Sequence, residues 1–307
     1  MRAFTLETFG AQPSLQDDIP EPLVGDDEIV VRVRASSVNP VDVFIAAGGL
    51  KELVEHEFPV TLGRDFAGTV ERVGSRVSRY AVGADVFGFV LHANPTVQEG
   101  SWAKLITVPE DKSVAQKPRS LDFAHAGAAP LSAITAIAAF DALAPAEGEN
   151  VLVVGAPGGV GSFFVQLASA TGANVIASGL PEDNEYLREL GAGELIDRNA
   201  DVAAAVREAH PDGVDAILDL VSPTPDVSLL NDDGRLASTL GAAGEGPGRF
   251  NLMAEPTPAN LQRLAQLLED GTLLVRIQRS YALEQAGEAL RALPATHTQG
   301  KLSVTLA

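Results

Sequence analysis

A glycine-rich turn between a predicted strand and a predicted helix is the segment with the clearest chemical meaning. The strand Asn150–Val154 runs into Gly155-Ala156-Pro157-Gly158-Gly159-Val160-Gly161, and a helix is predicted from Ser162 to Thr171. Glycine lets the backbone turn sharply and approach a pyrophosphate, while the helix N-terminus supplies N–H groups and a partial positive charge. The alternative is a tight turn that binds nothing. We predict a dinucleotide-binding loop whose contacts are Ala156, Gly158, Gly159, Val160 and Gly161.

The residue that ends the next predicted strand bears on the choice of dinucleotide. NAD-binding proteins place Asp or Glu there to bind the ribose 2′-hydroxyl, whereas this chain has Ser178. Arg198 follows the next strand and has the forked geometry that suits a phosphate, although a solvated loop arginine is an equal alternative. Glu182 and Asp183 would oppose a 2′-phosphate. On balance we expect NADP(H).

Strands and helices that could carry this loop are visible along the whole chain. The first third is β-rich: Ile29–Ala35 alternates as a half-buried strand, and glycines punctuate the short strands that follow it. Leu121–Leu143 is rich in alanine and leucine and is predicted to be helical, and from Asn150 strands alternate with helices. Two later strands, Val214–Leu220 and Arg235–Leu240, end beside the remaining cofactor candidates, which are Val221, Leu240 and Gly241. The pattern predicts an α/β protein with a barrel-like β domain and a doubly wound parallel sheet.

Composition excludes several functions. The 307 residues include no cysteine and carry a net charge of −19. The chain therefore has no disulfide, thiolate zinc site or cysteine nucleophile, and its acidity argues against nucleic acid and anionic membranes as partners. No apolar run is long enough for a membrane span, and no signal peptide is evident, so we expect a cytoplasmic protein.

Several further segments resemble one known family when they are taken together with the loop. They occur in the family's order and spacing, and they are Asn39-Pro40-Val41-Asp42, Leu62-Gly63-Arg64-Asp65-Phe66-Ala67-Gly68, Gly100-Ser101-Trp102-Ala103, Pro130-Leu131 with Thr135-Ala136, and Gly300-Lys301. Over nearly its whole length the chain resembles the zinc-free quinone oxidoreductase branch of the medium-chain dehydrogenases/reductases. The resemblance implies a GroES-like catalytic domain at residues 1–121 and 254–307 and a Rossmann NADP(H)-binding domain at 122–253. It also implies a homodimer or homotetramer.

The resemblance also bears on metal. Zinc-dependent relatives carry a cysteine near the position of Asn39 and a His-Glu pair after the glycine equivalent to Gly63, where this chain has Arg64 and Asp65. Its five histidines are scattered. We therefore expect no metal site.

Four residues are candidates for the reacting centre because of the resemblance. Asn39 matches an asparagine near the nicotinamide, Thr135 matches a threonine that touches it, and Arg64 matches a zinc-ligand position. For Asn39 the alternative is a turn before Pro40, and for Thr135 it is a helix hydroxyl bound to its own backbone. Phe44 occupies a position where relatives have tyrosine or lysine, so it cannot donate a proton and is expected to stack on a flat acceptor.

The resemblance thus implies an NADP(H)-dependent enzyme that transfers hydride to a quinone or another conjugated carbonyl. Two alternatives stay open. One is an enoyl or alkenal double-bond reductase of biosynthesis or detoxification. The other is an NADPH-binding protein without turnover. This alternative stays open because Phe44 has no hydroxyl that could donate a proton.

Overall fold

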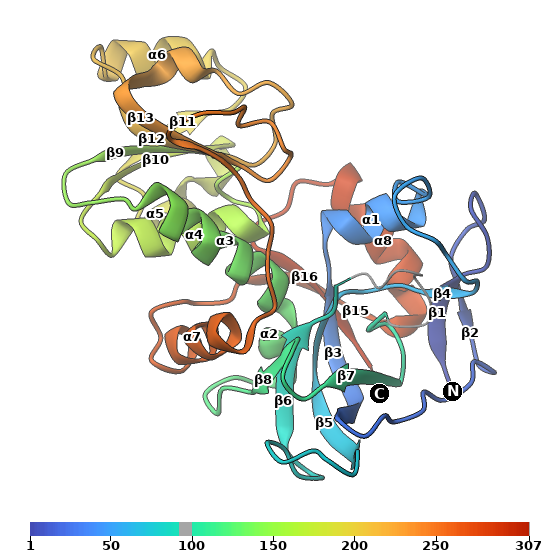
Figure 1. Ribbon diagram of the computed structural model, residues 1–307. Coiled ribbons are helices and arrows are strands. Elements are labelled where there is room, and N and C mark those ends of the chain that lie inside the picture. Colours follow the sequence, from blue (N-terminus) through green and yellow to red (C-terminus); the bar gives the residue numbers. More distant parts are fainter. Residues whose placement is uncertain (92–99, 307) are drawn as a thin grey trace. The chain divides into compact units, whose positions relative to one another are not determined.

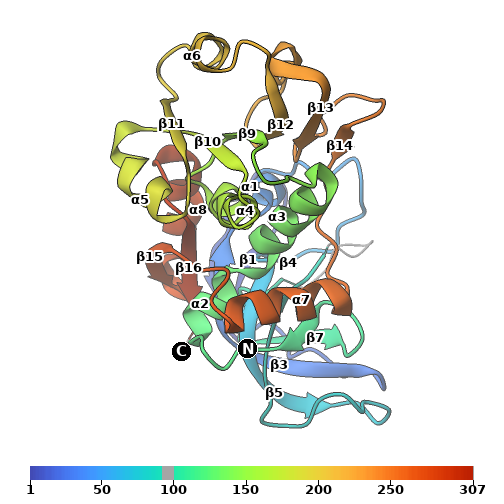
Figure 2. The ribbon, with the colours of Figure 1, turned by 90° about the vertical axis from the view of Figure 1, so that its left-hand side faces the viewer.

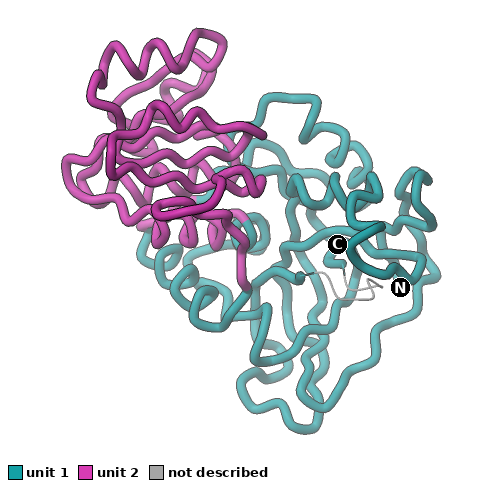
Figure 3. The backbone as a smooth tube through the Cα atoms, turned by 45° about the horizontal axis from the view of Figure 1, so that its top comes forward, with its two compact units in different colours: residues 1–131, 256–271, 275–307 teal, residues 132–255, 272–274 magenta. Residues whose placement is uncertain are grey.

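The computed structural model describes residues 1–91 and 100–306, and the chain divides into two units (Figure 3). Unit 1 comprises Met1–Leu131, Pro256–Gly271 and Val275–Ala307, whereas unit 2 comprises Ser132–Glu255 and Thr272–Leu274. The functional domain bounds given above stay a prediction. None of the helices within the described residues is both long and apolar enough to cross a membrane.

Unit 1 is built on a seven-stranded sheet. Its strand order is β15-β16-β3-β5-β6-β8, with β7 paired to β3. The strands are β3 (Glu28–Val38), β5 (Asp65–Val73), β6 (Asp85–Phe89), β7 (Leu105–Pro109), β8 (Val114–Gln116), β15 (Ile277–Ala282) and β16 (Lys301–Thr305). A smaller sheet has the order β2-β1-β4 and consists of β1 (Ala3–Leu6), β2 (Ser14–Gln16) and β4 (Val60–Thr61).

The central strand β3 is longer and more buried than its sequence predicted. The alternation over Ile29–Ala35 indicated one buried face, yet most of Glu28–Val38 is buried. The reason is tertiary, because β3 pairs with β5, β7 and β16, and the helix α2 (Phe123–Ala128) packs against it. The unit 1 core gathers around this strand and includes the fully buried Trp102.

The first helix of unit 1 begins at a proline that directly follows Asn39. β3 ends at Val38 and α1 (Pro40–Ala46) begins two residues later, so Asn39 is the single residue between them. Pro40 cannot extend the strand ladder but suits the first turn of a helix. The other helices of this unit are α7 (Pro258–Glu269), α8 (Ala286–Ala295) and the 3-10 helix η3 (Leu283–Gln285).

The helical structure predicted over Leu121–Leu143 is confirmed from Phe123 onwards, with a break at Ala129. The structure has two helices here, α2 and α3 (Pro130–Leu143), separated at Ala129. Pro130 lacks the N–H that would continue α2, and it restricts the backbone of the residue before it.

Unit 2 contains a six-stranded sheet in which every adjacent pair is parallel. Its order is β11-β10-β9-β12-β13-β14. The strands are β9 (Asn150–Val154), β10 (Asn174–Gly179), β11 (Glu194–Asp197), β12 (Val214–Asp219), β13 (Leu230–Ser238) and β14 (Arg249–Asn251). Counted from β9, this is the order 3-2-1-4-5-6 of the doubly wound dinucleotide-binding fold. The predicted α/β class with a doubly wound sheet is therefore confirmed.

Helices cover both faces of this sheet (Figure 1). Helices α3, α4 (Gly159–Ser169) and α5 (Asn184–Glu189) lie on one face, and α6 (Val202–Ala209) lies on the other. Figure 2 shows α4 end-on beside α3. Two 3-10 turns, η1 (Pro181–Asp183) and η2 (Val227–Leu229), complete the unit. In parallel sheets of this kind, ligands bind at the carboxyl edge where the strand order reverses, which here is the edge between β9 and β12.

Candidate functional site

The glycine loop lies at this reversal point. β9 ends at Val154, Gly155 adopts φ +89, and α4 begins at Gly159 with Gly158 as its N-cap. A Cβ on Gly161 would lie 2.4 Å from the carbonyl oxygen of Gly155, so this glycine is required for α4 to pack on the loop. A Cβ on Gly158 would meet only that same oxygen, at 3.5 Å. The loop therefore combines one glycine that permits close packing with another that leaves open space beside a helix N-terminus.

Two short polar side chains shape the edge of the sheet next to this loop. The buried carboxylate of Asp219 ends β12 and accepts hydrogen bonds from the N–H groups of Val221 (3.0 Å) and Ser222 (2.8 Å). The buried hydroxyl of Ser238 ends β13 and accepts the N–H of Leu240 at 3.1 Å. Both turns leave an apolar side chain exposed at the edge, Val221 (59%) and Leu240 (55%).

These turns refine the sequence predictions at two places. The predicted strand Arg235–Leu240 ends at Ser238, because that hydroxyl draws Leu240 out of the ladder and Gly241 then turns at φ +71. Asp219 and Ser238 themselves were missed. A short polar residue at the end of a buried strand, before a turn, is a local signal that could have found both. Val221 lies at the loop, since a Cβ on Gly155 would come within 3.1 Å of its side chain.

The residues predicted to contact the ribose and its 2′-phosphate, Ser178 and Arg198, lie at the ends of the neighbouring strands β10 and β11. Ser178 is buried in β10, opposite Ile196 of β11. Arg198 follows directly on β11, and its backbone N–H donates to the carbonyl oxygen of Gly179 at 2.8 Å, so it lies beside the end of β10. Its side chain is exposed and forms no ion pair within the described residues.

The two acidic residues near this site, Glu182 and Asp183, differ in burial. Asp183 is fully buried, and its carboxylate accepts the N–H of Leu180 at 2.7 Å. It therefore serves the turn after β10, whereas Glu182 is exposed. Only Glu182 thus presents its carboxylate to solvent.

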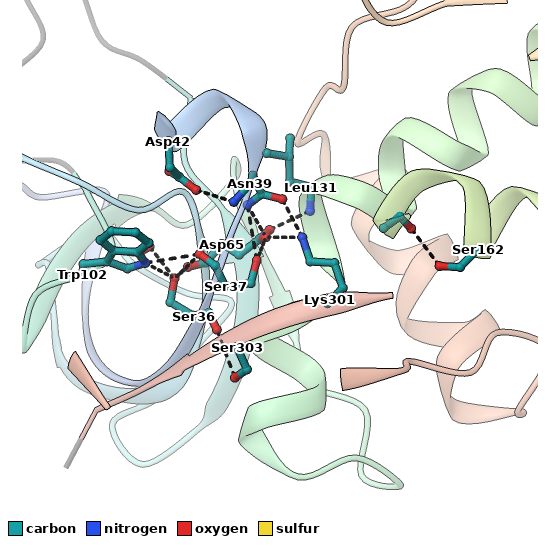
Figure 4. A network of polar contacts seen from close by, with 12 residues as sticks. Ser36, Ser37, Asn39, Asp42, Asp65, Trp102, Leu131, Ser162, Lys301 and Ser303 are labelled. Atoms are coloured by element: carbon teal, nitrogen blue, oxygen red, sulfur yellow. Dashed lines mark hydrogen bonds and ion pairs between the residues drawn. The ribbon is translucent and has the colours of Figure 1, made fainter. Parts of the chain in front are cut away.

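In unit 1 a buried polar network surrounds Asp65 (Figure 4). Its Oδ2 accepts from the Oγ of Ser37 (2.5 Å) and the Nδ2 of Asn39 (2.8 Å). Its Oδ1 accepts the backbone N–H of Leu131 at 2.7 Å. Lys301 donates from Nζ to the Oδ1 of Asn39 at 2.6 Å. Both carboxylate oxygens of Asp65 are therefore engaged in hydrogen bonds within unit 1.

This network constrains the predicted role of Asn39. The Nδ2 of Asn39 donates to Asp65 and also to the Oγ of Ser37 at 3.3 Å, so both amide hydrogens have partners inside unit 1. The match of Asn39 to an asparagine near the nicotinamide stays a prediction. The sequence missed Ser37 and did not single out Lys301 as a site residue, because each acts through contacts that span many residues of chain.

A second buried pair, Asp42 and Arg64, adjoins the start of α1. Burial raises the pKa of Asp42 to about 7, against the opposing effect of the Arg64 guanidinium. The carboxylate of Asp42 accepts the backbone N–H of Asn39 at 2.8 Å. Arg64 is itself buried and donates to the carbonyl oxygen of Thr61 at 3.3 Å. The position equivalent to a zinc ligand in relatives therefore holds a guanidinium.

The other two candidates lie on helices. Phe44 projects from α1 with half of its surface exposed, and its ring lies over Gly49, where a Cβ would clash at 2.3 Å. Thr135 lies on α3 and is buried. Within residues 1–91 and 100–306, no three His, Asp or Glu side chains gather as metal ligands.

Comparison with known proteins agrees with this architecture. Residues 25–119 match the family described as alcohol dehydrogenase GroES-like domain, and residues 190–304 match the family described as zinc-binding dehydrogenase. Together with the strand order and the glycine loop, these matches define a dehydrogenase built from a GroES-like domain and a Rossmann domain. The chain belongs to the medium-chain dehydrogenase/reductase family, in its quinone oxidoreductase branch.

Individual relatives are similar over nearly the whole chain. An Arabidopsis thaliana NADPH-dependent alkenal/one oxidoreductase is 28% identical over 99% of this chain and 79% of its own length. A Lama guanicoe quinone oxidoreductase is 29% identical over 98% of this chain and 95% of its own length. The solved quinone oxidoreductase from Coxiella burnetii superposes with a TM-score of 0.88 at 27% identity, covering 100% of this chain and 99% of that one.

Proposed function

We propose that this protein is an NADPH-dependent reductase that delivers hydride to a quinone or another conjugated carbonyl compound without using zinc. The observation that carries the proposal is the glycine loop at the reversal point of a 3-2-1-4-5-6 parallel sheet. The relatives named above, a quinone oxidoreductase and an NADPH-dependent alkenal/one oxidoreductase, support the same chemistry.

The residues of unit 2 fit a dinucleotide. The α4 N-terminus, with the open space at Gly158, suits the pyrophosphate. Arg198 would hold the 2′-phosphate beside Ser178, because it is exposed and its backbone is hydrogen-bonded to the last residue of β10. Val221 and Leu240 offer apolar surface at the same edge, and a Cβ on Gly241 would meet nothing within 4 Å.

The proposed reaction needs little acid catalysis by protein side chains. When bound, the reduced nicotinamide supplies a hydride from its C4 atom. A quinone or enone spreads the added charge over a conjugated system, so the reaction does not depend on a Lewis acid to the extent that alcohol oxidation does. Phe44 offers a half-exposed ring on which a flat acceptor stacks, and it carries no proton to donate. The proton then comes from water or from the ribose hydroxyl.

The decisive experiment is NADPH consumption with a panel of quinones and enones. We expect turnover with at least one member of the panel, and product analysis then separates quinone reduction from reduction of an enone double bond. Tight NADPH binding without turnover on any acceptor would overturn the proposal in favour of a binding protein. Exclusive alcohol oxidation that is lost in chelator would overturn the zinc-independent part.

Three further properties stay predictions from the sequence and its family resemblance. They are the division into a catalytic domain at residues 1–121 and 254–307 and a cofactor domain at 122–253, a cytoplasmic location, and assembly as a homodimer or homotetramer. Subcellular fractionation and sedimentation analysis would test the last two.

A further inference from the structure

The start of β16 brings a buried lysine against Asn39. β16 pairs antiparallel with β3 through Leu302 and Val38, and just beyond this last pair the side chains of Lys301 and Asn39 are hydrogen-bonded. Gly300 adopts φ +74, and a Cβ there would lie 2.4 Å from the carbonyl oxygen of Arg276, so the strand entry requires glycine. Lys301 is only 4% exposed.

This lysine fixes the orientation of the Asn39 amide. An ammonium group donates hydrogen bonds but accepts none, so the amide oxygen must face the Nζ of Lys301, 2.6 Å away. The amide hydrogens then face Asp65 and Ser37. The other oxygen of Asp65 accepts the backbone N–H of Leu131. One chain of hydrogen bonds therefore runs from Lys301 through Asn39 and Asp65 to Leu131 (Figure 4).

The chain of hydrogen bonds reaches the starts of two helices. Asn39 precedes the first residue of α1, the helix that carries Phe44. Leu131 is the second residue of α3, the helix that carries Thr135 one turn later. A carboxylate at a helix start accepts an N–H that has no partner within the helix and interacts favourably with the helix dipole. The network thus fixes the first turn of each helix that carries a candidate catalytic residue.

Packing alone does not account for a lysine at this place. Burial lowers the pKa of Lys301, although the nearby carboxylates of Asp65 and Asp42 oppose that effect. A well-packed apolar side chain would avoid the desolvation cost and is often no less stable than a buried ion pair. The Nζ also lies closer to the neutral amide oxygen, at 2.6 Å, than to the Asp65 carboxylate, at 3.7 Å. Its main effect is therefore to orient Asn39.

We propose that Lys301 is a positioning residue of this reductase, which holds the first turns of α1 and α3 in place through Asn39 and Asp65. The expected consequence for turnover rests on the proposed function. The structural consequence rests only on the hydrogen bonds of unit 1.

The test compares Lys301→Met and Lys301→Gln with the control Lys117→Met. Lys117 is a partly buried lysine of unit 1; its Nζ donates to the backbone oxygens of Pro118 and Leu121 and lies 5.4 Å from the centre of the Phe123 ring. For Lys301→Met we expect kcat to fall at least about tenfold, with a smaller change in KM for the acceptor. NADPH affinity should change less than about twofold, since the glycine loop belongs to unit 2. Lys301→Gln keeps a donor and should lose less activity, and Lys117→Met should keep wild-type kcat.

Hydrogen exchange supplies a readout that does not depend on activity. We expect the backbone amide of Leu131 to exchange at least about tenfold faster in Lys301→Met than in the wild type, and to be unchanged in Lys117→Met. Wild-type kcat together with unchanged exchange at Leu131 in Lys301→Met would overturn the proposal. Equal losses in Lys301→Met and Lys117→Met would overturn it too, because they would reflect general destabilisation.

Two further outcomes are separated by this design. If Lys301→Met does not fold, the comparison of Lys301→Gln with Lys117→Met decides the question by the same measurements. If the wild type reduces neither quinones nor enones, the proposed function fails, while the exchange at Leu131 still decides whether Lys301 holds the start of α3.

Discussion

Replacing Arg198 by alanine should weaken NADPH binding selectively. The arginine follows β11 and lies beside the end of β10, where its backbone N–H donates to the carbonyl oxygen of Gly179 at 2.8 Å. Its side chain is exposed and forms no ion pair within residues 1–91 and 100–306, so removing it leaves no charged partner unsatisfied. Any loss of affinity can therefore be assigned to the ligand.

The size of the effect follows from the strength of a charge-assisted hydrogen bond. A guanidinium–phosphate contact contributes about 1.5–3 kcal/mol, which is a factor of about 10–150 in Kd. Asp183 is buried and its carboxylate serves the turn after β10, so Glu182 is the acidic residue that opposes the phosphate. Its exposed charge is screened beyond about 8 Å at physiological salt. The direct contact should therefore dominate.

Calorimetric titration of NADPH and NADH at physiological salt measures this difference. The matched control is Arg207→Ala, which removes an equal charge from an exposed arginine of unit 2 that pairs with Asp226 at 3.1 Å. We expect Arg198→Ala to lose affinity for NADPH by about tenfold or more, to keep its affinity for NADH, and to differ from the control. Equal weakening of both cofactors would show that Arg198 acts through general electrostatics. A wild type that prefers NADH would refute the interpretation of Ser178 as well.

Further predictions concern the glycine loop, Phe44, Asp42 and the metal content. Gly158→Val should lower NADPH affinity at least about tenfold. Its melting temperature should stay near that of the wild type, because the backbone φ of −71 suits any residue and the space around Gly158 is open. Gly161→Ala should instead lower the free energy of unfolding by about 1–3 kcal/mol through the clash with Gly155. Phe44→Tyr should reduce quinones or enones at least as fast as the wild type, and a sharp loss of rate at unchanged stability would show that the ring shapes the pocket. Asp42→Asn should stabilise the protein more at pH 8 than at pH 5, as measured by urea unfolding. The purified protein should contain far less than one zinc per chain and keep its activity in chelator.

The direction of the pH effect follows from the raised pKa of Asp42. Burial moves it from 3.8 to about 7 in the folded state, so folding favours the protonated carboxyl. The stabilisation that the protonated Asp42 carboxyl gives the folded state is fully present below about pH 4. It is lost as the pH rises through 7, which lowers the free energy of unfolding by up to about 4 kcal/mol. Asparagine has no proton to lose and still accepts the N–H of Asn39. An identical difference in stability between variant and wild type at both pH values would contradict the raised pKa.

The sequence predicted those parts of the fold that depend on neighbouring residues. The glycine loop was recognisable because strand, turn and helix start all lie between Asn150 and Gly161. The split at Pro130 and the turns at Asp219 and Ser238 had equally local signals, and a stricter use of proline and of short polar residues at strand ends would have found them.

The buried network of unit 1 could not be predicted in this way. Lys301 and Asn39 are 262 residues apart, and only the antiparallel register of β16 and β3 brings them together. Sequence spacing contains no information on that register, nor on the direction in which Arg64 points. The resemblance marked Asn39 and Arg64 as positions, whereas the contacts that define their chemistry depend on tertiary structure.

The expectation of zinc independence gains a physical reason from this network. The positions where zinc-dependent relatives place ligands are held here by Asn39, Arg64 and Asp65, with the ammonium of Lys301 beside them. A divalent cation would therefore meet two buried cationic side chains, and the carboxylate of Asp65 is already bound to Ser37, Asn39 and Leu131. Metal binding would have to break these hydrogen bonds and overcome like-charge repulsion in a medium of low polarity. Elemental analysis that found about one zinc per chain, with activity lost in chelator and restored by zinc, would refute this reasoning, because it would require the Arg64 and Lys301 side chains to leave their buried positions.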